Sequence, residues 1–101
     1  MEIEIYYRLV LSSGASYKDS SVDRVSVNAN GDIIHLRDAV KLKNHNKLSS
    51  IDASQLTVYA TRADLLDINV QPLEVDVVVS GLGKTIDSSV FVVVPDDTQQ
   101  Q

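Results

Sequence analysis

The stretch "NGDIIHLRDAVKLKN", Asn30–Asn44, decides how the rest of the chain is interpreted. Its apolar residues recur at helical spacing, which places Ile33, Leu36 and Val40 on one face. Asp32 is a good N-cap, because its carboxylate can accept hydrogen bonds from the free backbone N–H groups of the first turn. The lysines near the end of the stretch suit a helix C-terminus. We therefore predict one amphipathic helix that begins after Asp32.

Two segments before this helix alternate between apolar and polar residues and are expected to be strands. They are Ile3–Leu11 and Ser21–Ala29. The turn-forming residues of Ser12–Ser16 lie between them, so a hairpin with a long connection is predicted. The inward positions would be Ile3, Ile5, Tyr7 and Leu9 in the first strand and Val25 and Val27 in the second.

The second half of the chain indicates more extended structure. A third strand is predicted over Ser54–Arg62 and a last strand over Ser88–Pro95. The segment between them is less regular. We expect it to hold a short strand broken near Pro72 and another extended piece at Val75–Val79.

This order of elements predicts an α+β fold of the β-grasp, or ubiquitin-like, type. One main helix would cover one face of a mixed sheet of four to five strands. The second strand, the helix and the third strand have the length of a crossover unit. The first and last strands would be neighbours, with the third beside the last. Residues 1–95 would form this domain, and the polar residues 96–101 would be a disordered tail.

Composition limits the possible functions. The chain has 101 residues, no cysteine and a net charge of −5. The charge argues against nucleic-acid binding, and the missing cysteines exclude disulfides and thiolate metal sites. Residues 64–101 hold one lysine against seven acidic residues, so this part is expected to repel anionic partners. No run of about 18 apolar residues occurs, and the N-terminus is unlike a secretory signal, so we expect neither a membrane span nor a signal peptide.

The stretch "SGLGKT", Ser80–Thr85, resembles the end of a phosphate-binding loop. The complete pattern needs a glycine at the position of Val78 and a helix after the threonine. The residues after Thr85 are typical of a strand instead. We therefore interpret Gly81 and Gly83 as the residues of a tight turn. A small nucleotide-binding or enzymatic domain that uses Gly81–Thr85, with Lys84 and Thr85 on the phosphates, is the alternative.

Other catalytic or metal-binding patterns have little support. His35 and His45 lie ten residues apart without a shared acidic partner, so we predict no metal site. The serines lie in turns, and no G-x-S-x-G pattern occurs. Asp96 and Asp97 are adjacent carboxylates, but nothing in the tail would orient them. We expect a protein that is not an enzyme and that binds no cofactor.

The sheet face opposite the helix is the predicted interaction site. Alternation in the last strand directs Phe91 and Val93 away from the helix, and the strand order brings Tyr6 and Tyr59 to the same face. Grouped exposed aromatic residues suggest a protein-binding patch. The alternative is that the segment after Arg62 folds over these side chains.

Four segments, in order, resemble the N-terminal domain of Crinkler effectors. They are "HLRDAVKLKN", "IDASQLTVYATR", "PLEVDVVVSGLG" and "SSVFVVVP". Leu36–Lys41 is similar to the helix motif L-K-D-A-I-K of that family, and Val92–Pro95 to its closing valines and proline. Asp52–Ser54 resembles the acidic turn before the family's L-x-L-F-L-A-K motif, from which Ala60 and Thr61 depart. The residues that resemble this motif, which is linked to translocation, are Leu56, Val58, Tyr59 and Arg62.

The resemblance implies a non-catalytic targeting and interaction module, ubiquitin-like in fold, at the start of a larger secreted effector. Such effectors act in the host cell or its nucleus, and a nuclease-, kinase- or NTPase-like region often follows their N-terminal domain. The expected partner is another protein or that following region, held through the sheet face or a sheet edge. We expect this domain to bind neither nucleic acid nor membrane. Pairing of a valine-rich edge with a second copy would give a homodimer.

Overall fold

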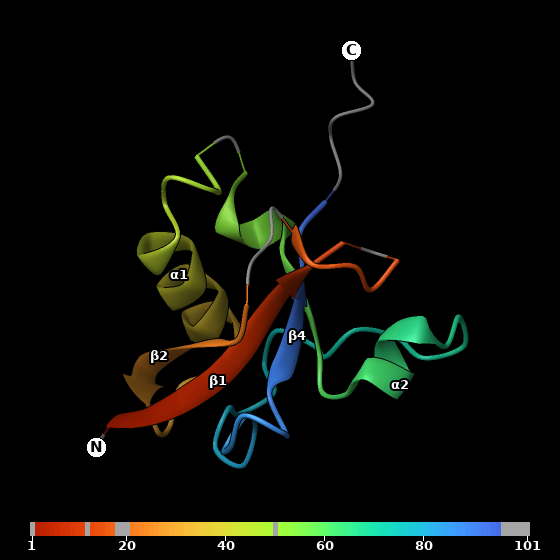
Figure 1. The fold of residues 1–101 in the computed structure, drawn as a ribbon. Coiled ribbons are helices and arrows are strands. Elements are labelled where there is room, and N and C mark those ends of the chain that lie inside the picture. The colour runs from red at the N-terminus through yellow and green to blue at the C-terminus, as the bar shows by residue number, and fades with distance from the viewer. Residues whose placement is uncertain (1, 12, 18–20, 50, 96–101) are drawn as a thin grey trace.

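The computed structural model describes residues 2–11, 13–17, 21–49 and 51–95. Within them, helix α1 and the short helix α2 lie on opposite sides of one sheet (Figure 1). The predicted tail, residues 96–101, is outside the described residues. The elements are β1 (Glu2–Val10), β2 (Asp23–Asn28), α1 (Ile33–Lys43), a 3₁₀ turn (Ala53–Gln55), β3 (Thr57–Tyr59), α2 (Arg62–Leu66) and β4 (Val90–Val93).

In the described part of the chain, the sheet has four strands in the order β2-β1-β4-β3. β1 pairs antiparallel with β2 and parallel with β4, and β3 pairs antiparallel with β4. The sheet is therefore mixed, with the first and last strands side by side at its centre. Helix α1 lies in the connection from β2 to β3. The predicted α+β fold with a β-grasp arrangement is confirmed.

Helix α1 begins where the sequence predicts. The Asp32 carboxylate accepts a hydrogen bond from the backbone N–H of His35 at 3.3 Å, and the His35 ring lies 2.8 Å from the same oxygen. Asn44 ends the helix as its C-cap. The amide of Asn44 also donates to the Tyr7 hydroxyl at 2.7 Å, which ties the end of α1 to β1. Burial raises the pKa of Tyr7, although this hydrogen bond opposes the shift.

The main core lies between α1 and the sheet. The helix contributes Ile33, Leu36 and Val40, as predicted, and all three are buried. Lys41 does not point to solvent, because its ammonium donates to the backbone carbonyls of Leu48 and Ile51. These contacts hold the chain after α1 against the helix. The sheet and its connections contribute Ile5, Tyr7, Leu9, Val25, Val27, Leu48, Ile51, Leu56, Val58, Val79, Val90, Val92 and Val94.

The third strand is shorter than predicted. β3 covers Thr57–Tyr59, whereas the sequence indicated Ser54–Arg62. At its start, the Gln55 side chain accepts a hydrogen bond from the Asp52 N–H at 2.8 Å and stabilises a 3₁₀ turn. At its end, the Thr61 hydroxyl accepts one from the Asp64 N–H at 3.1 Å and caps α2. Local capping bonds therefore replace strand pairing at both ends.

The segment between β3 and β4 was predicted wrongly. The structure has helix α2 where the short strand was expected to begin. Of the extended piece expected at Val75–Val79, residues 75–76 form a turn and only Val78 takes part in β-pairing, as an isolated bridge. The Val77 N–H donates to the Glu74 carbonyl at 3.1 Å and closes this turn. Val78 makes an isolated β-bridge to Asp32, and the Leu73 N–H donates to the Val58 carbonyl at 2.8 Å. The segment is thus attached to the fold by isolated backbone hydrogen bonds, which do not build a strand, and by the packing of Val79 in the main core.

Candidate functional site

The predicted aromatic patch is partly covered. Phe91 is 8% exposed and Val93 is 9% exposed, so neither faces solvent as expected. They form a small second cluster with Val10. Tyr59 of β3 and Leu65 of α2 pack against this cluster. The alternative, in which the segment after Arg62 folds over this face, is what the structure shows. Tyr6 and Tyr59 are half-buried, and a role for the four residues in partner binding stays a prediction.

The residues that resemble a translocation motif divide into two groups. Leu56 and Val58 are fully buried in the main core. Tyr59 is half-buried, and Arg62 is exposed as the first residue of α2. Only the last two could contact a partner from this position. The two apolar residues have a sufficient explanation in packing.

The loop that resembles a phosphate-binding loop is a turn against β1. Gly81 and Gly83 have φ angles of 95° and 55°, the region that favours glycine. The Gly83 carbonyl accepts a hydrogen bond from the Tyr6 N–H at 2.8 Å. A Cβ on Gly83 would lie 2.6 Å from both Ile5 Cγ2 and the Tyr6 carbonyl oxygen. After Lys84 the chain turns again and enters β4 without forming a helix. The helix N-terminus that a phosphate-binding loop requires is therefore missing here.

The two histidines do not form a metal site. His35 takes part in the cap of α1, and His45 is exposed after the helix. Over the described part of the chain, no cluster of three or more His, Cys, Asp or Glu side chains could bind a metal ion. Within the same residues, none of the helices has the length and apolar character needed to cross a membrane.

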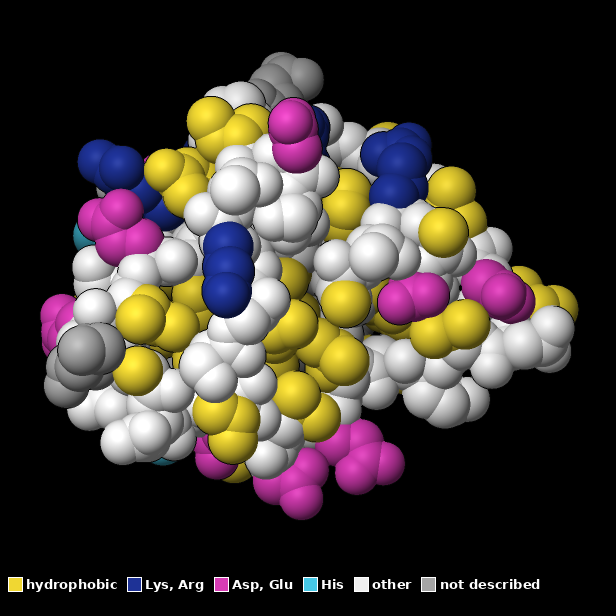
Figure 2. Space-filling view, turned by 90° about the horizontal axis from the view of Figure 1, so that it is seen from below, with side chains coloured by type: hydrophobic (Ala, Val, Ile, Leu, Met, Phe, Trp, Pro, Cys, Tyr) yellow, Lys and Arg dark blue, Asp and Glu magenta, His cyan; other side chains and the backbone are white. Residues whose placement is uncertain are grey.

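Exposed hydrophobic side chains do not gather on one element. In the view of Figure 2 they reach the surface at several places between polar and charged groups. Those of α1 and α2 are separate in the fold, and the others lie in the long connection to β4. A single large apolar docking face is therefore not the main feature of this surface. The larger exposed ones are Ile34, Leu42, Leu66, Ile68, Val75, Val78 and Ile86.

The outer edge of β2 offers a different kind of site. In an antiparallel pair, residues alternate between those that bond to the partner strand and those that point away from it. The Tyr6 N–H donates to the Gly83 carbonyl and therefore points away from β2. Tyr6 and its cross-strand neighbour Arg24 are thus a pair without mutual hydrogen bonds, and the backbone N–H and C=O of Arg24 point to the outer edge of β2. By the same alternation, the backbone groups of Ser26 and Asn28 also point to the outer edge.

Most of these outward groups have local partners. The Arg24 carbonyl accepts a hydrogen bond from the Lys43 ammonium at 2.6 Å, and the Arg24 N–H donates to the Asp23 carboxylate at 2.8 Å. The Asn28 carbonyl accepts one from the Gly31 N–H at 2.8 Å. In the described chain, the outward N–H and C=O of Ser26 have no such partner. They lie at the middle of an exposed edge.

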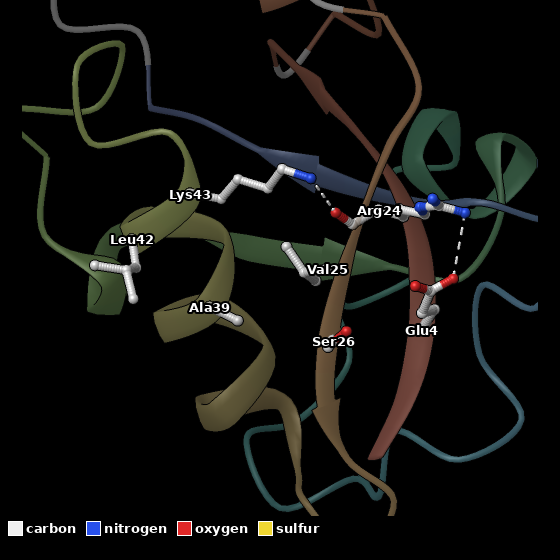
Figure 3. A pocket seen from close by; sticks show the side chains of 7 residues that line it. All are labelled: Glu4, Arg24, Val25, Ser26, Ala39, Leu42 and Lys43. Atoms are coloured by element: carbon white, nitrogen blue, oxygen red, sulfur yellow. Dashed lines mark hydrogen bonds and ion pairs between the residues drawn. The ribbon is translucent and has the colours of Figure 1, made fainter.

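A groove of about 280 Å³ runs beside this edge, between β2 and α1. Figure 3 shows Val25 and Ser26 on the strand and Ala39 directed toward them from the helix. Leu42 of α1 also lines the groove and is 75% exposed. The groove therefore combines apolar and charged lining residues with the backbone groups of Ser26, which have no partner in the described chain.

The charges at the ends of the groove are already paired. Arg24 lies 3.3 Å from Glu4, and Lys43 lies 3.0 Å from Asp23. Burial alone would raise the pKa of Asp23, but hydrogen bonds from Lys43 and from the Arg24 N–H outweigh it and lower this pKa. The groove consequently presents little net charge to a partner.

The opposite edge of the sheet is less open. The Val58 carbonyl on the outer side of β3 accepts the hydrogen bond from Leu73, so the chain after α2 covers part of that edge. β2 has no equivalent cover from the described residues. We infer that β2 is the more accessible of the two edges.

Comparisons with known proteins add no assignment. No family model matches this chain, and no curated protein matches it. The fold and the groove therefore carry the functional argument.

The sequence did not reveal the groove. Alternation assigned Val25 to the inner side of a strand, but the position of α1 beside that strand depends on the packing of the whole domain. One signal was present. Leu42 is a large apolar residue that lies outside the stripe of Ile33, Leu36 and Val40.

Proposed function

We propose that this chain is a non-catalytic protein-interaction module that binds an extended segment of a partner along β2. The observation that carries the proposal is the pair of unpartnered Ser26 backbone groups, in the described chain, beside the groove. An added strand would bond to these groups, as in other cases of strand addition. Every second side chain of the added strand would point toward α1.

The groove favours an uncharged aliphatic side chain on the partner. Val25, Ala39 and Leu42 supply apolar contacts, and the nearby cations are neutralised by Asp23 and Glu4. A charged side chain would have to break these ion pairs or remain unpaired. Binding should therefore depend weakly on ionic strength.

The resemblance to the N-terminal domains of Crinkler effectors extends this proposal. We propose that the module belongs to the start of a secreted effector and holds either a host protein or the effector region behind it. The quoted segments and the β-grasp fold support this part. The downstream reading frame tests it: a nuclease-, kinase- or NTPase-like region would support the targeting role, and an unrelated sequence would contradict it.

Docking at β2 can be tested by changing one backbone group. Proline is tolerated on a strand edge where the N–H faces solvent, so Ser26→Pro should remove the outward donor without breaking the β1–β2 ladder. Ser26→Ala is the matched control, because it removes the hydroxyl and keeps the N–H. Peptides selected from a random display library against the native chain should bind Ser26→Ala normally and lose about tenfold or more in affinity for Ser26→Pro.

Two results would contradict docking at β2. One is a set of selected peptides that bind both variants equally, which would place the site elsewhere. The other is a library that yields no binder. Thermal unfolding of both variants within a few degrees of the native chain would establish that the fold is intact.

A further inference from the structure

A second cavity, of about 440 Å³, lies on the sheet face opposite α1. Arg8 of β1, Arg62 of α2 and Ser89 before β4 line it from three separate segments of the chain. Phe91 contributes an apolar wall. The cavity is distinct from the groove at β2 and shares no residue with it.

The two arginines of this cavity have no partner among the described residues. Elsewhere in the fold, Arg24 pairs with Glu4, and Arg37 donates to backbone carbonyls. Across the described part of the chain, neither Arg8 nor Arg62 makes an ion pair or a side-chain hydrogen bond. Two arginines without a partner in the described chain thus line one cavity of a chain with a net charge of −5. They form a local positive site on an acidic protein.

Ser89 adds a hydrogen-bonding group with no partner in the described chain. It is 4% exposed and is the one buried polar residue among the residues that the structure describes. Ser89 lines the cavity, whereas the next residue, Val90, is buried in the main core. The Ser88 hydroxyl bonds to Thr85, whereas the described residues offer the Ser89 hydroxyl no partner. The Ser89 hydroxyl is therefore free to donate a hydrogen bond to a ligand oxygen in the cavity.

One acidic group lies at the same cavity. Asp87 is among the lining residues, but it is exposed and pairs with neither arginine. Two guanidinium groups and one carboxylate leave the cavity with a positive balance. Asp87 should weaken the binding of an anion without preventing it.

We propose that this cavity binds a tetrahedral oxyanion of the phosphate class. A planar carboxylate is satisfied by the fork of one arginine. Two forks and a hydroxyl from three segments offer more donors than two carboxylate oxygens use in one plane. Phosphate has enough oxygens to accept from all three residues. This proposal is independent of docking at β2, and either can fail without the other.

The test titrates inorganic phosphate into the native chain and follows the amide signals by NMR at constant ionic strength. We expect saturable shifts at Arg8, Arg62 and Ser89. Arg8→Gln and Arg62→Gln should each weaken binding about tenfold, because each removes charge-assisted hydrogen bonds. Ser89→Ala should weaken it by a smaller factor.

Two further variants make the test specific. Asp87→Asn removes the opposing charge and should tighten binding about twofold or more. Arg24→Gln is the matched control, because Arg24 is an exposed arginine of the same sheet that already pairs with Glu4. It should leave phosphate affinity unchanged. Titrations with O-phosphoserine and with inositol trisphosphate assign the source of the phosphate group to whichever binds more tightly.

Three results would overturn the proposal. The first is a set of shifts that do not saturate or that sodium chloride reproduces. The second is an equal loss of affinity in Arg24→Gln and Arg8→Gln, which would indicate a general charge effect. The third is acetate binding as tight as phosphate binding, which would remove the preference for a tetrahedral anion.

Discussion

Helices α1 and α2 cover opposite faces of the same sheet, and they do so to very different extents. Helix α1 has 11 residues and buries Ile33, Leu36 and Val40 in the main core. Helix α2 has five residues, none of them buried, and covers a cluster of Val10, Phe91 and Val93. The core under α1 should therefore contribute most of the free energy of unfolding. The α2 side is a local cover, which leaves room on that face for a polar cavity.

The largest expected effect comes from removing a leucine from each helix. Leu36→Ala empties a fully buried site and should lower the free energy of unfolding by about 3 kcal/mol or more. Leu65→Ala is the matched change in α2, where the side chain is only partly buried, and it should cost about 1 kcal/mol. Urea denaturation of both variants measures the difference.

Equal losses in the two variants would contradict this division. They would mean that α2 belongs to the same cooperative unit as α1. Hydrogen exchange offers an independent check, because the amides of α2 should exchange faster than those of α1 if the cover opens locally.

The sequence predicted the α1 side well because its signals are local and agree with one another. Apolar spacing, the Asp32 cap and the strand alternation of β1 all indicate the same packing. Helix α2 was missed because Arg62–Leu66 is too short to show a helical period. Its cap at Thr61 lies inside a stretch that alternates like a strand. Length and cap position, more than composition, explain the error.

The candidate sites were harder to predict than the fold. Alternation assigned Phe91 and Val93 to the correct face but could not show that α2 covers that face. The open edge at Ser26 follows from the register of β1 against β2 and from the position of Gly83 beside β1. The cavity at Ser89 depends on three segments that are distant in the sequence. These features arise from tertiary contacts, which the pattern of residues along the chain does not indicate.

Adjacent valines in β4 give a narrower comparison of the two faces. Val92 is fully buried under α1, and Val93 lies in the small cluster under α2. Val92→Ala should lower the free energy of unfolding by about 2 kcal/mol, and Val93→Ala by about 1 kcal/mol. The two changes remove the same atoms from the same strand, so strand propensity largely cancels. If denaturant unfolding showed a larger loss of unfolding free energy for Val93→Ala than for Val92→Ala, the main core would lie on the α2 side of the sheet.

The smallest expected effect separates the two helices by pH. A hydrogen bond from His35, together with backbone N–H groups of the first turn, lowers the pKa of Asp32 below its ordinary value. A carboxyl with a lowered folded-state pKa stabilises the fold above its unfolded value, about 3.9, and loses this contribution as the pH falls through the folded value. Asp32→Asn keeps a capping oxygen but cannot titrate. Its Tm should be below that of the native chain at pH 7, and the gap should narrow in acid.

Helix α2 supplies the control for this measurement, because its cap, Thr61, does not titrate. Thr61→Ser should differ from the native chain by the same amount at every pH. Acid also affects the other carboxyl groups, and it does so in all three proteins. The comparison therefore uses the difference in Tm between each variant and the native chain at each pH. A constant gap for Asp32→Asn down to about pH 2 would mean that the charge of Asp32 does not stabilise α1. A Tm difference that changes with pH for Thr61→Ser would mean that α2 shares the acid-sensitive contacts of α1. The two helices would then have to be treated as one unit.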